Sequence, residues 1–399
     1  MKKILLLGGS AQQVVAIDKA KELGLYTVLC DYLPDNPGQF HADRFYSAST
    51  TDRDTVLQIA REEKIDGVLA YASDPAAPTA AYVAERLGLP SNPLAAVNIL
   101  CHKDLFRAYL RQNGFNAPQS GAYTSPEEAG AARDCFHLPV IVKPVDSSGS
   151  KGATVLRDWA SFDDAAAYAL RYSREHRFIV EEYIEKAHPY LVGGDLFVID
   201  GKIVLWGLLN CHRDPAVNAL VPAGKSYPLA LDREQELRFR DCLQTLVTSL
   251  GITSGAMNVE LIMDGNGDVW PIDIGPRNGG NMIPDLLAMI FGTDVVEMTV
   301  RTAMGEKIPD IVPEGKGFFA TYNLHSREEG KLRAIRFADE LDTYIVRKNI
   351  YVREGDPVHP FTHAAYALGI VFLAFPDKEK MFDILGRIDD LVFIDMDRE

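Results

Sequence analysis

The sequence predicts a protein of mixed class, with a parallel α/β domain first, an α+β domain after it and a small β-rich domain last. Three observations predict this order. The chain opens with an apolar run, a glycine turn and a helical stretch, which is the pattern of a βαβ unit. Further on, turn residues at 200–201 and 264–267 separate apolar strands and indicate antiparallel hairpins. A length of 399 residues suits two or three domains.

The first domain is expected to cover residues 1–95. Its pattern alternates, with strands at residues 4–7, 26–30 and 67–70 and helices up to about residue 23, at 54–64 and at 79–87. Gly8, Gly9 and Asp31 resemble part of a dinucleotide fingerprint, but the GxGxxG spacing is absent. We interpret the two glycines as a tight turn, so a nicotinamide-dependent oxidoreductase would depend on these three residues alone.

The second domain is expected at residues 96–310 and the third at 311–399. A helix at 103–113 precedes a segment with strands expected at residues 140–144, 178–182, 196–199, 203–208, 258–263 and 269–274. The hairpin turns between them predict a largely antiparallel sheet. Glycine-rich turns, Val/Phe strands and a last helix at 378–388 predict a small closing domain.

The composition narrows the class of partner. A formal net charge of -15 and a pI of about 5.1 argue against binding to nucleic acid, for which a basic face is expected. The five cysteines are widely spaced and form no CxxC pair, which disfavours structural zinc. The sequence has neither a signal-peptide pattern nor an apolar run of the roughly 18 residues that span a bilayer. These features predict a cytoplasmic protein with small-molecule ligands.

A lysine in an apolar strand is the first candidate for chemistry. Lys143 directly precedes the loop 147–152, which is rich in Ser and Gly. Burying an ammonium group without an anionic partner is costly, and a phosphate would be such a partner. Backbone N–H groups of the loop could bind neighbouring phosphate oxygens. The alternative is an edge-strand lysine followed by an ordinary flexible loop.

The strand expected at 178–182 ends in Glu181 and Glu182, and Tyr183 and Ile184 follow it directly. This sequence suits a hinge between two lobes. Backbone groups there could read the edge of an adenine ring, with Ile184 covering its face. The alternative is a plain strand with solvated glutamates.

Two carboxylates lie on the apolar hairpin at 258–277. With a loop at 264–267, Met263 would pair with Asp268 and Glu260 with Pro271, which makes Glu260 and Asp273 diagonal neighbours about 7–8 Å apart. Mg²⁺ between them would relieve their repulsion and reach phosphate oxygens. A solvated acidic pair is the alternative.

Taken in order, Lys103, the Lys143 strand and loop, the Glu181 hinge and the Glu260/Asp273 hairpin resemble the ATP-grasp superfamily, over nearly the whole chain. The resemblance implies a two-lobed fold at 96–310 with ATP and Mg²⁺ as cofactors. It implies nucleotide contacts from Lys103, Lys143, Ser147, Ser148, Gly149, Ser150, Gly152, Glu181, Glu182, Tyr183 and Ile184. It also implies that Glu260 and Asp273 bind magnesium and that Arg277 stabilises the transferred phosphoryl group or the acyl phosphate.

The chain departs from the family pattern at three places. Many members have Glu at the position of Asp273 and Asn at the position of Gly275. Asn258 or Asn278 could supply the missing ligand. The usual ribose-binding Glu has no clear match, and Glu185 or His188 could replace it.

The resemblance implies that a carboxylate attacks the γ-phosphorus of ATP and that an amine or similar nucleophile captures the acyl phosphate. His212, Arg213 and Lys225 lie in a segment that faces the acceptor in related enzymes, although a solvated loop is the alternative. Asp74 follows a strand of the parallel sheet, where α/β ligands usually bind. Arg213, Arg277 and Asp74 are therefore the candidate substrate ligands, and Lys143 and Arg277 the candidate catalytic residues.

A carboxylate-amine ligase is the leading hypothesis, either an amino-acid or dipeptide ligase or a short relative of carbamoyl phosphate synthase. A purine-pathway ligase of the glycinamide ribonucleotide kind is the runner-up, and a biotin carboxylase is disfavoured because no biotin-carrier segment is visible. A non-catalytic ATP-binding regulator is the alternative that Gly275 favours. A homodimer is expected from the family and from the prevalence of two-fold oligomers.

Overall fold

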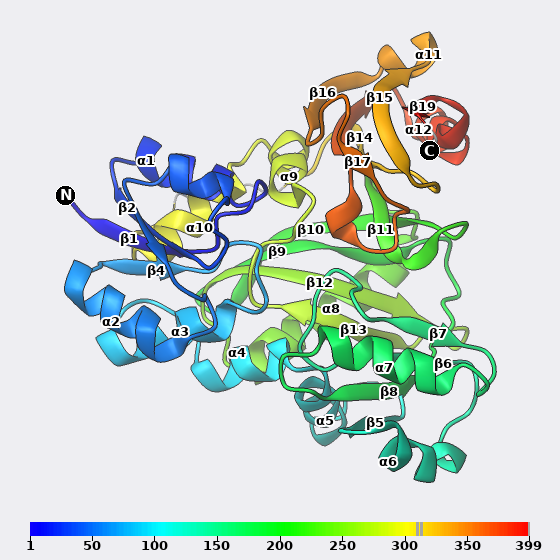
Figure 1. Cartoon of the computed structure of the whole chain (residues 1–399), viewed down its shortest axis with the longest axis horizontal. Coiled ribbons are helices and arrows are strands. Elements are labelled where there is room, and N and C mark those ends of the chain that lie inside the picture. Colours follow the sequence, from blue (N-terminus) through cyan, green and yellow to red (C-terminus); the bar gives the residue numbers. More distant parts are fainter. Residues whose placement is uncertain (309–310, 312–313, 398–399) are drawn as a thin grey trace.

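The computed structural model describes residues 1–308, 311 and 314–397. Figure 1 shows a parallel sheet with helices on both of its faces, a long curved sheet through the centre, and two smaller β-containing units beside that sheet. None of the helices in these described residues has the length and apolar character needed to cross a bilayer.

The N-terminal unit is a four-stranded parallel sheet in the order β3-β2-β1-β4, which confirms the predicted parallel sheet. Its elements are β1 Lys3–Leu7, α1 Val14–Glu22, β2 Tyr26–Asp31, β3 Arg44–Ser47, α2 Arg53–Glu63, β4 Gly67–Leu69, α3 Ala77–Leu87 and α4 Leu94–Cys101. Helix α10 (Val295–Ala303) also packs here, because Val296 and Val300 join the cluster built from Ile4, Leu6 and Leu29. A segment from late in the chain therefore completes the first unit.

The central sheet has eight strands in the order β13-β12-β9-β10-β11-β14-β18-β16, and every pairing in it is antiparallel, as predicted. The strands are β9 Leu191–Ile199, β10 Lys202–Asp214, β11 Asn218–Tyr227, β12 Gly255–Met263, β13 Val269–Gly275, β14 Phe318–Leu324, β16 Ile345–Ile350 and β18 Gly369–Phe375. Strands from beyond residue 310 thus continue the same sheet. The predicted domain boundaries at 95 and 310 stay predictions.

The segment that holds His212, Arg213 and Lys225, for which a solvated loop is the alternative, forms the long β10–β11 hairpin. The strand expected at 203–208 therefore continues to Asp214. Cys211, His212 and Arg213 near the end of β10 line a cavity, whereas Lys225 on β11 is buried and does not line it.

Two smaller sheets flank the central one. The first has the order β5-β8-β6-β7, from Ser120–Tyr123, Phe178–Glu182, Val140–Pro144 and Thr154–Leu156, with α5 Lys103–Gln112, α6 Pro126–Ala131 and α7 Phe162–Tyr172 nearby. The second has the order β17-β15-β19, from Pro357–Val358, Gly330–Phe337 and Val392–Asp397, with α11 Asp339–Asp342 and α12 Lys378–Gly386. The central sheet also carries α8 Arg233–Ser249 and α9 Ile283–Phe291.

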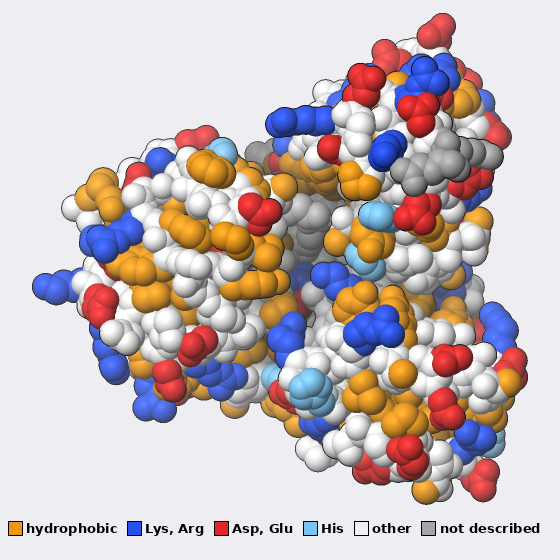
Figure 2. Space-filling view, in the orientation of Figure 1, with side chains coloured by type: hydrophobic (Ala, Val, Ile, Leu, Met, Phe, Trp, Pro, Cys, Tyr) orange, Lys and Arg blue, Asp and Glu red, His pale blue; other side chains and the backbone are white. Residues whose placement is uncertain are grey.

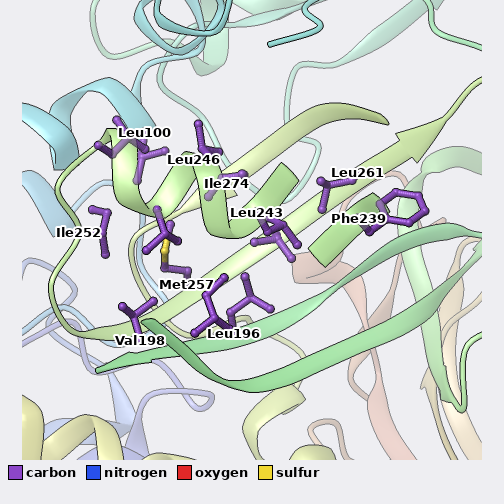
Figure 3. Packing of buried hydrophobic residues seen from close by; sticks show 14 of the residues in the cluster. Leu100, Leu196, Val198, Phe239, Leu243, Leu246, Ile252, Met257, Leu261 and Ile274 are labelled. Atoms are coloured by element: carbon purple, nitrogen blue, oxygen red, sulfur yellow. The ribbon is translucent and has the colours of Figure 1, made fainter. Parts of the chain in front are cut away.

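The largest apolar cluster lies between α8 and one face of the central sheet (Figure 3). Helix α8 begins at a capping box in which Asp232 and Gln235 satisfy each other's backbone N–H groups. Its apolar face then presents Phe239, Leu243 and Leu246 to strands β9, β12 and β13. The opposite face of the helix is exposed, so the 3.6-residue period decides which side packs. This cluster holds β12 and β13 in place from behind.

We expect Leu243→Ala to lower the free energy of unfolding by about 2–5 kcal/mol, because Leu243 is fully buried and the change leaves a cavity. Leu237 lies on the same helix but is 48% exposed, so Leu237→Ala should change stability by no more than about 0.5 kcal/mol. Chemical denaturation of both variants measures the difference. Equal destabilisation would contradict the assigned face of α8.

Candidate functional site

A cavity of about 460 Å³ lies between the β5-β8-β6-β7 sheet and the central sheet. Figure 2 shows the molecule hollowed between its lobes, with Lys and Arg side chains at the rim. The cavity brings together most residues predicted from the sequence: Lys103, Lys143, Ser147, Ser148, Gly149, Ser150, Glu181, Glu182, Tyr183, Ile184, Arg213, Glu260 and Asp273. Gly152, His188, Asp74 and Arg277 do not line it.

The predicted strand lysine has a buried anionic partner. Lys143 on β6 pairs with Glu181 on the neighbouring strand β8, and Arg107 on α5 donates to the same carboxylate at 3.0 Å. Burial alone would raise the pKa of Glu181, but Arg107 and Lys143 outweigh it and lower that pKa to about 2. One carboxylate is therefore shared by two cations, and the trio carries a net charge of one positive unit that is available to a ligand.

The loop 147–152 is held over the cavity from two sides. Lys103 Nζ donates to the carbonyl oxygen of Ser147 at 2.6 Å, and Ser150 Oγ donates to the carbonyl oxygen of Leu220 on β11 at 2.9 Å. Gly149 and Gly152 have φ angles of 66° and 74°, the left-handed region that favours glycine. A Cβ at Gly152 would lie 2.8 Å from the ring of Pro144, so this glycine serves the turn rather than the cavity wall.

The segment after β8 suits a flat aromatic ring. The N–H groups of Glu182 and Tyr183 are bound to backbone carbonyls, whereas the N–H of Ile184 has no hydrogen-bond partner within the described part of the chain. Three isoleucines, Ile141, Ile262 and Ile272, line the cavity beside it. An apolar slot beside a free backbone donor is the kind of pocket that holds a nucleobase.

His188 does not occupy the predicted position. Its Nε2 accepts the N–H of Met263 at 3.0 Å, and its ring packs edge-on against Phe239 behind the cavity wall. Burial lowers the pKa of His188, so the ring is neutral and structural. The predicted ribose contact therefore has no support at His188, while Glu185 is exposed.

The two hairpin carboxylates are closer in register than predicted. Glu260 pairs directly with Asp273, not with Pro271. The register is shifted by one residue from the turn onwards, and a β-bulge between Glu260 and Leu261 adds one further residue to β13. The predicted pairing of Met263 with Asp268 is also wrong, since Met263 pairs with Val269. Directly opposed residues have Cβ atoms about 4.5–5.5 Å apart, so the bulge brings the two side chains onto one face, side by side.

The two carboxylates differ in their partners. Glu260 Oε1 accepts from Arg213 at 2.8 Å and lies 4.0 Å from Lys225. No hydrogen bond or salt bridge reaches the Asp273 carboxylate from any described residue. Burial alone would raise the pKa of Asp273, but Lys103, Lys143 and Arg277 outweigh it, so that pKa is lowered and the group is ionised.

The pair of carboxylates fits a hard cation such as Mg²⁺, because the ionised Asp273 has no direct partner in the part of the chain that the structure describes and lies beside Glu260. Among the described residues no group of three His, Cys, Asp or Glu side chains could hold a metal, so water and ligand oxygens would complete the shell.

The two family models that match this chain follow the order of its units. Residues 17–91 match an ATP-grasp N-terminal domain, and residues 136–285 match an ATP-grasp domain. The chain is an ATP-grasp protein. The family resemblance predicted from the sequence is thereby confirmed.

Two solved structures share the fold of this chain at low identity, and a curated relative matches part of it. An L-amino acid ligase from Bacillus licheniformis has a TM-score of 0.82 at 19% identity, with 100% of this chain and 99% of that chain covered. A phosphoribosylglycinamide synthetase from Anaerococcus prevotii has a TM-score of 0.76 at 21% identity, with 99% and 100% covered. The carbamoyl phosphate synthase large chain of Corynebacterium glutamicum is 24% identical over 79% of this chain, which spans only 29% of that relative.

Neither asparagine takes the place of the ligand that this ATP-grasp protein lacks at Gly275. Asn258 faces Gly275 across the hairpin, but its Nδ2 donates to Gly194 O at 3.0 Å and to Asp195 Oδ1 at 2.9 Å. Asn278 is fully buried and lines a separate small hollow. Glu260 and Asp273 are thus the two protein carboxylates that this face offers.

Arg277 and Asp74 form one unit that sequence reasoning had treated as two separate residues. Arg277 follows β13, Asp74 lies between β4 and α3, and their side chains make an ion pair. Asp195 fixes the loop that carries Arg277, because it accepts the N–H of Gly279 at 2.8 Å. The pair lies outside the cavity wall, on the side of the N-terminal unit.

Two further polar residues have roles in the structure that the sequence did not predict. Arg107 was not singled out from the sequence, although it lies four residues after Lys103 on a helix face shared with Phe106 and Leu110. An arginine on such an apolar face indicates a buried partner.

His212 was a candidate anion ligand, but burial, with Lys225 and Arg213 nearby, lowers its pKa to about 4. It is therefore neutral at pH 7 and cannot hold an anion by charge.

Glu181→Gln should lower the free energy of unfolding at pH 7 by about 3–5 kcal/mol, because it leaves two buried cations without their carboxylate. The pKa of Glu181 falls on folding from its usual 4.5 to about 2, so this stabilisation is complete above about pH 4.5 and is lost as the pH falls towards 2. Denaturant titrations of both proteins between pH 7 and acid test this. A difference that stays constant below pH 4.5 would contradict the shared ion pair.

Proposed function

We propose that this chain binds Mg²⁺·ATP in the cavity and uses it to activate a substrate carboxylate for attack by an amine. The observation that carries the proposal is the direct pairing of Glu260 with Asp273, on a cavity whose other walls hold Lys103 and Lys143. An anionic triphosphate with its metal matches both sets of charges. The slot beside Ile184 is the proposed adenine site.

Each group has a role in the proposed reaction. Lys103 and Lys143 bind phosphate oxygens, and the loop 147–152 covers them. Glu260 and Asp273 would hold the metal, which would supply positive charge to the phosphates. The substrate carboxylate oxygen attacks the γ-phosphorus as its bond to the β-phosphate oxygen breaks, which releases ADP. The amine then attacks the carbonyl carbon, loses a proton and displaces phosphate. Arg277 holds the substrate carboxylate and then the acyl phosphate. The protein acts by positioning and charge, with no covalent intermediate.

An amino-acid ligase is the form of this activity that we propose first, because the L-amino acid ligase shares the fold from end to end. A glycinamide ribonucleotide-type ligase is the second candidate, since its fold also matches along the whole chain. A non-catalytic ATP-binding regulator is favoured by the absence of a side chain at Gly275. ADP release over a panel of amino acids, bicarbonate and ribonucleotide amines separates these three, because a regulator binds ATP without acceptor-dependent turnover.

Lys143→Met should lower acceptor-dependent ADP release by about 10²–10³-fold, because it removes a charge aimed at the phosphates and keeps the aliphatic stem. Lys202→Met, at the exposed start of β10, is the matched control and should retain wild-type turnover. A coupled assay of ADP release measures both. Full activity of the Lys143 variant would remove the proposed phosphate contact.

Asp273→Asn should raise the Mg²⁺ concentration for half-maximal turnover, and for tight ADP binding measured by calorimetry, by about 10-fold or more. Asp268→Asn removes an exposed carboxylate from the turn of the same hairpin and should leave both values unchanged. If the two variants respond alike to Mg²⁺, Asp273 is not a metal ligand.

A further inference from the structure

Gly275 leaves a space that another residue fills. A Cβ at this position would overlap Asp74 Oδ1 and would lie 3.1 Å from the guanidinium carbon of Arg277. The carboxylate of Asp74 therefore occupies the place where a side chain on β13 would project. Because Asp273 and residue 275 lie on the same face of β13, the Asp74–Arg277 pair stands next to the acidic pair, on the side of the N-terminal unit.

Each member of this pair keeps an unused hydrogen-bonding position. Arg277 Nη2 donates to Asp74 Oδ2, while Oδ1 has no hydrogen-bond partner among residues 1–308, 311 and 314–397. Arg277 Nε is buried and also lacks a partner in that part of the chain. The pair thus offers one free acceptor and one free donor.

A second, independent observation points to a ligand here. Asn278 is fully buried, and neither its Nδ2 nor its Oδ1 has a partner among the described residues. It lines a hollow of about 100 Å³ together with Arg277, and a further hollow of about 190 Å³ lies on the Asp74 side of the pair. A buried amide without hydrogen bonds is costly, and a polar ligand would satisfy it.

We propose that the Asp74–Arg277 pair is the recognition site for the zwitterionic head of an α-amino acid, with the carboxylate on Arg277 and the α-ammonium group on Asp74. This inference rests on the proposed function, for which it names the class of carboxylate substrate. The carboxylate bound by Arg277 is the one that the γ-phosphate activates. Asn278 donates a further hydrogen bond to that carboxylate.

Charge balance selects this class of ligand. A zwitterion exchanges the internal ion pair for two ion pairs and leaves no charge without a partner. A simple carboxylic acid or bicarbonate would occupy Arg277 and leave Asp74 unpaired, and a simple amine would do the reverse. Leaving a mostly buried charge unpaired is costly, so the site should reject both kinds of analogue. Gly275 is then a condition of this specificity, because any side chain there would displace Asp74.

The test is calorimetry of wild-type protein with Mg²⁺ and a non-hydrolysable ATP analogue, titrated with the proteinogenic L-amino acids and with matched pairs such as alanine and propionate. At least one amino acid should bind, and its desamino partner should bind about 100-fold more weakly. Asp74→Asn should weaken the amino acid by about 10–100-fold and leave the affinity for the ATP analogue within about twofold. Asp54→Asn, an exposed change on α2, is the matched control and should have no effect.

Gly275→Ala is the second variant, since it keeps both charges and displaces Asp74. It should also weaken amino-acid binding, and a thermal melt confirms that both variants are folded. The proposal is overturned if no amino acid binds, if propionate binds as tightly as alanine, or if Asp74→Asn binds amino acids like the wild type.

ADP release keeps the two proposals apart. Turnover driven by bicarbonate or by carboxylates without an ammonium group would preserve the ligase proposal and overturn the zwitterion site. Amino-acid binding that depends on Asp74, without ADP release for any acceptor, would preserve the site and overturn the ligase proposal.

Discussion

The buried carboxylate of Glu181 is the group on which the arrangement of the cavity depends. It binds Lys143 on the neighbouring strand and Arg107 on α5, and Arg107 also donates to the carbonyl oxygen of Ile272 on β13 at 2.6 Å. A single ion-paired network therefore joins the small sheet, helix α5 and the central sheet. Because all three side chains are largely removed from water, loss of the Glu181 carboxylate would leave two buried cations without their counter-charge. The two walls of the cavity keep their spacing for this reason.

The sequence was sufficient for the features that depend on local pattern. The parallel sheet follows from alternating apolar runs and glycine turns, and the antiparallel pairing of β12 with β13 follows from the turn at residues 264–267. The residues of the cavity were found as a set because Lys143, Glu181, Glu260 and Asp273 are each unusual for an apolar strand. Their convergence on one cavity of the structure agrees with that prediction.

What sequence reasoning missed depends on single insertions and on contacts distant along the chain. The bulge beside Glu260 shifts the register by one residue, and no local pattern distinguishes an even pairing from a bulged one except Pro271, which cannot donate to a ladder. Arg107 and Glu181 are far apart in sequence, as are Asp74 and Arg277, so their pairing follows only from the packing of separate units. His188 was misplaced for a different reason, since its ring accepts a backbone N–H group behind the cavity wall instead of facing a ligand.

The Asp74 carboxylate lies where a side chain at position 275 would project, so positions 74 and 275 constrain each other. Asp74 belongs to the N-terminal unit and Gly275 to the central hairpin, and the presence of one excludes a side chain at the other. A relative with a side chain at position 275 would need a smaller residue at position 74. The two units therefore cannot be exchanged freely between relatives, and the two positions should vary together across the lineage.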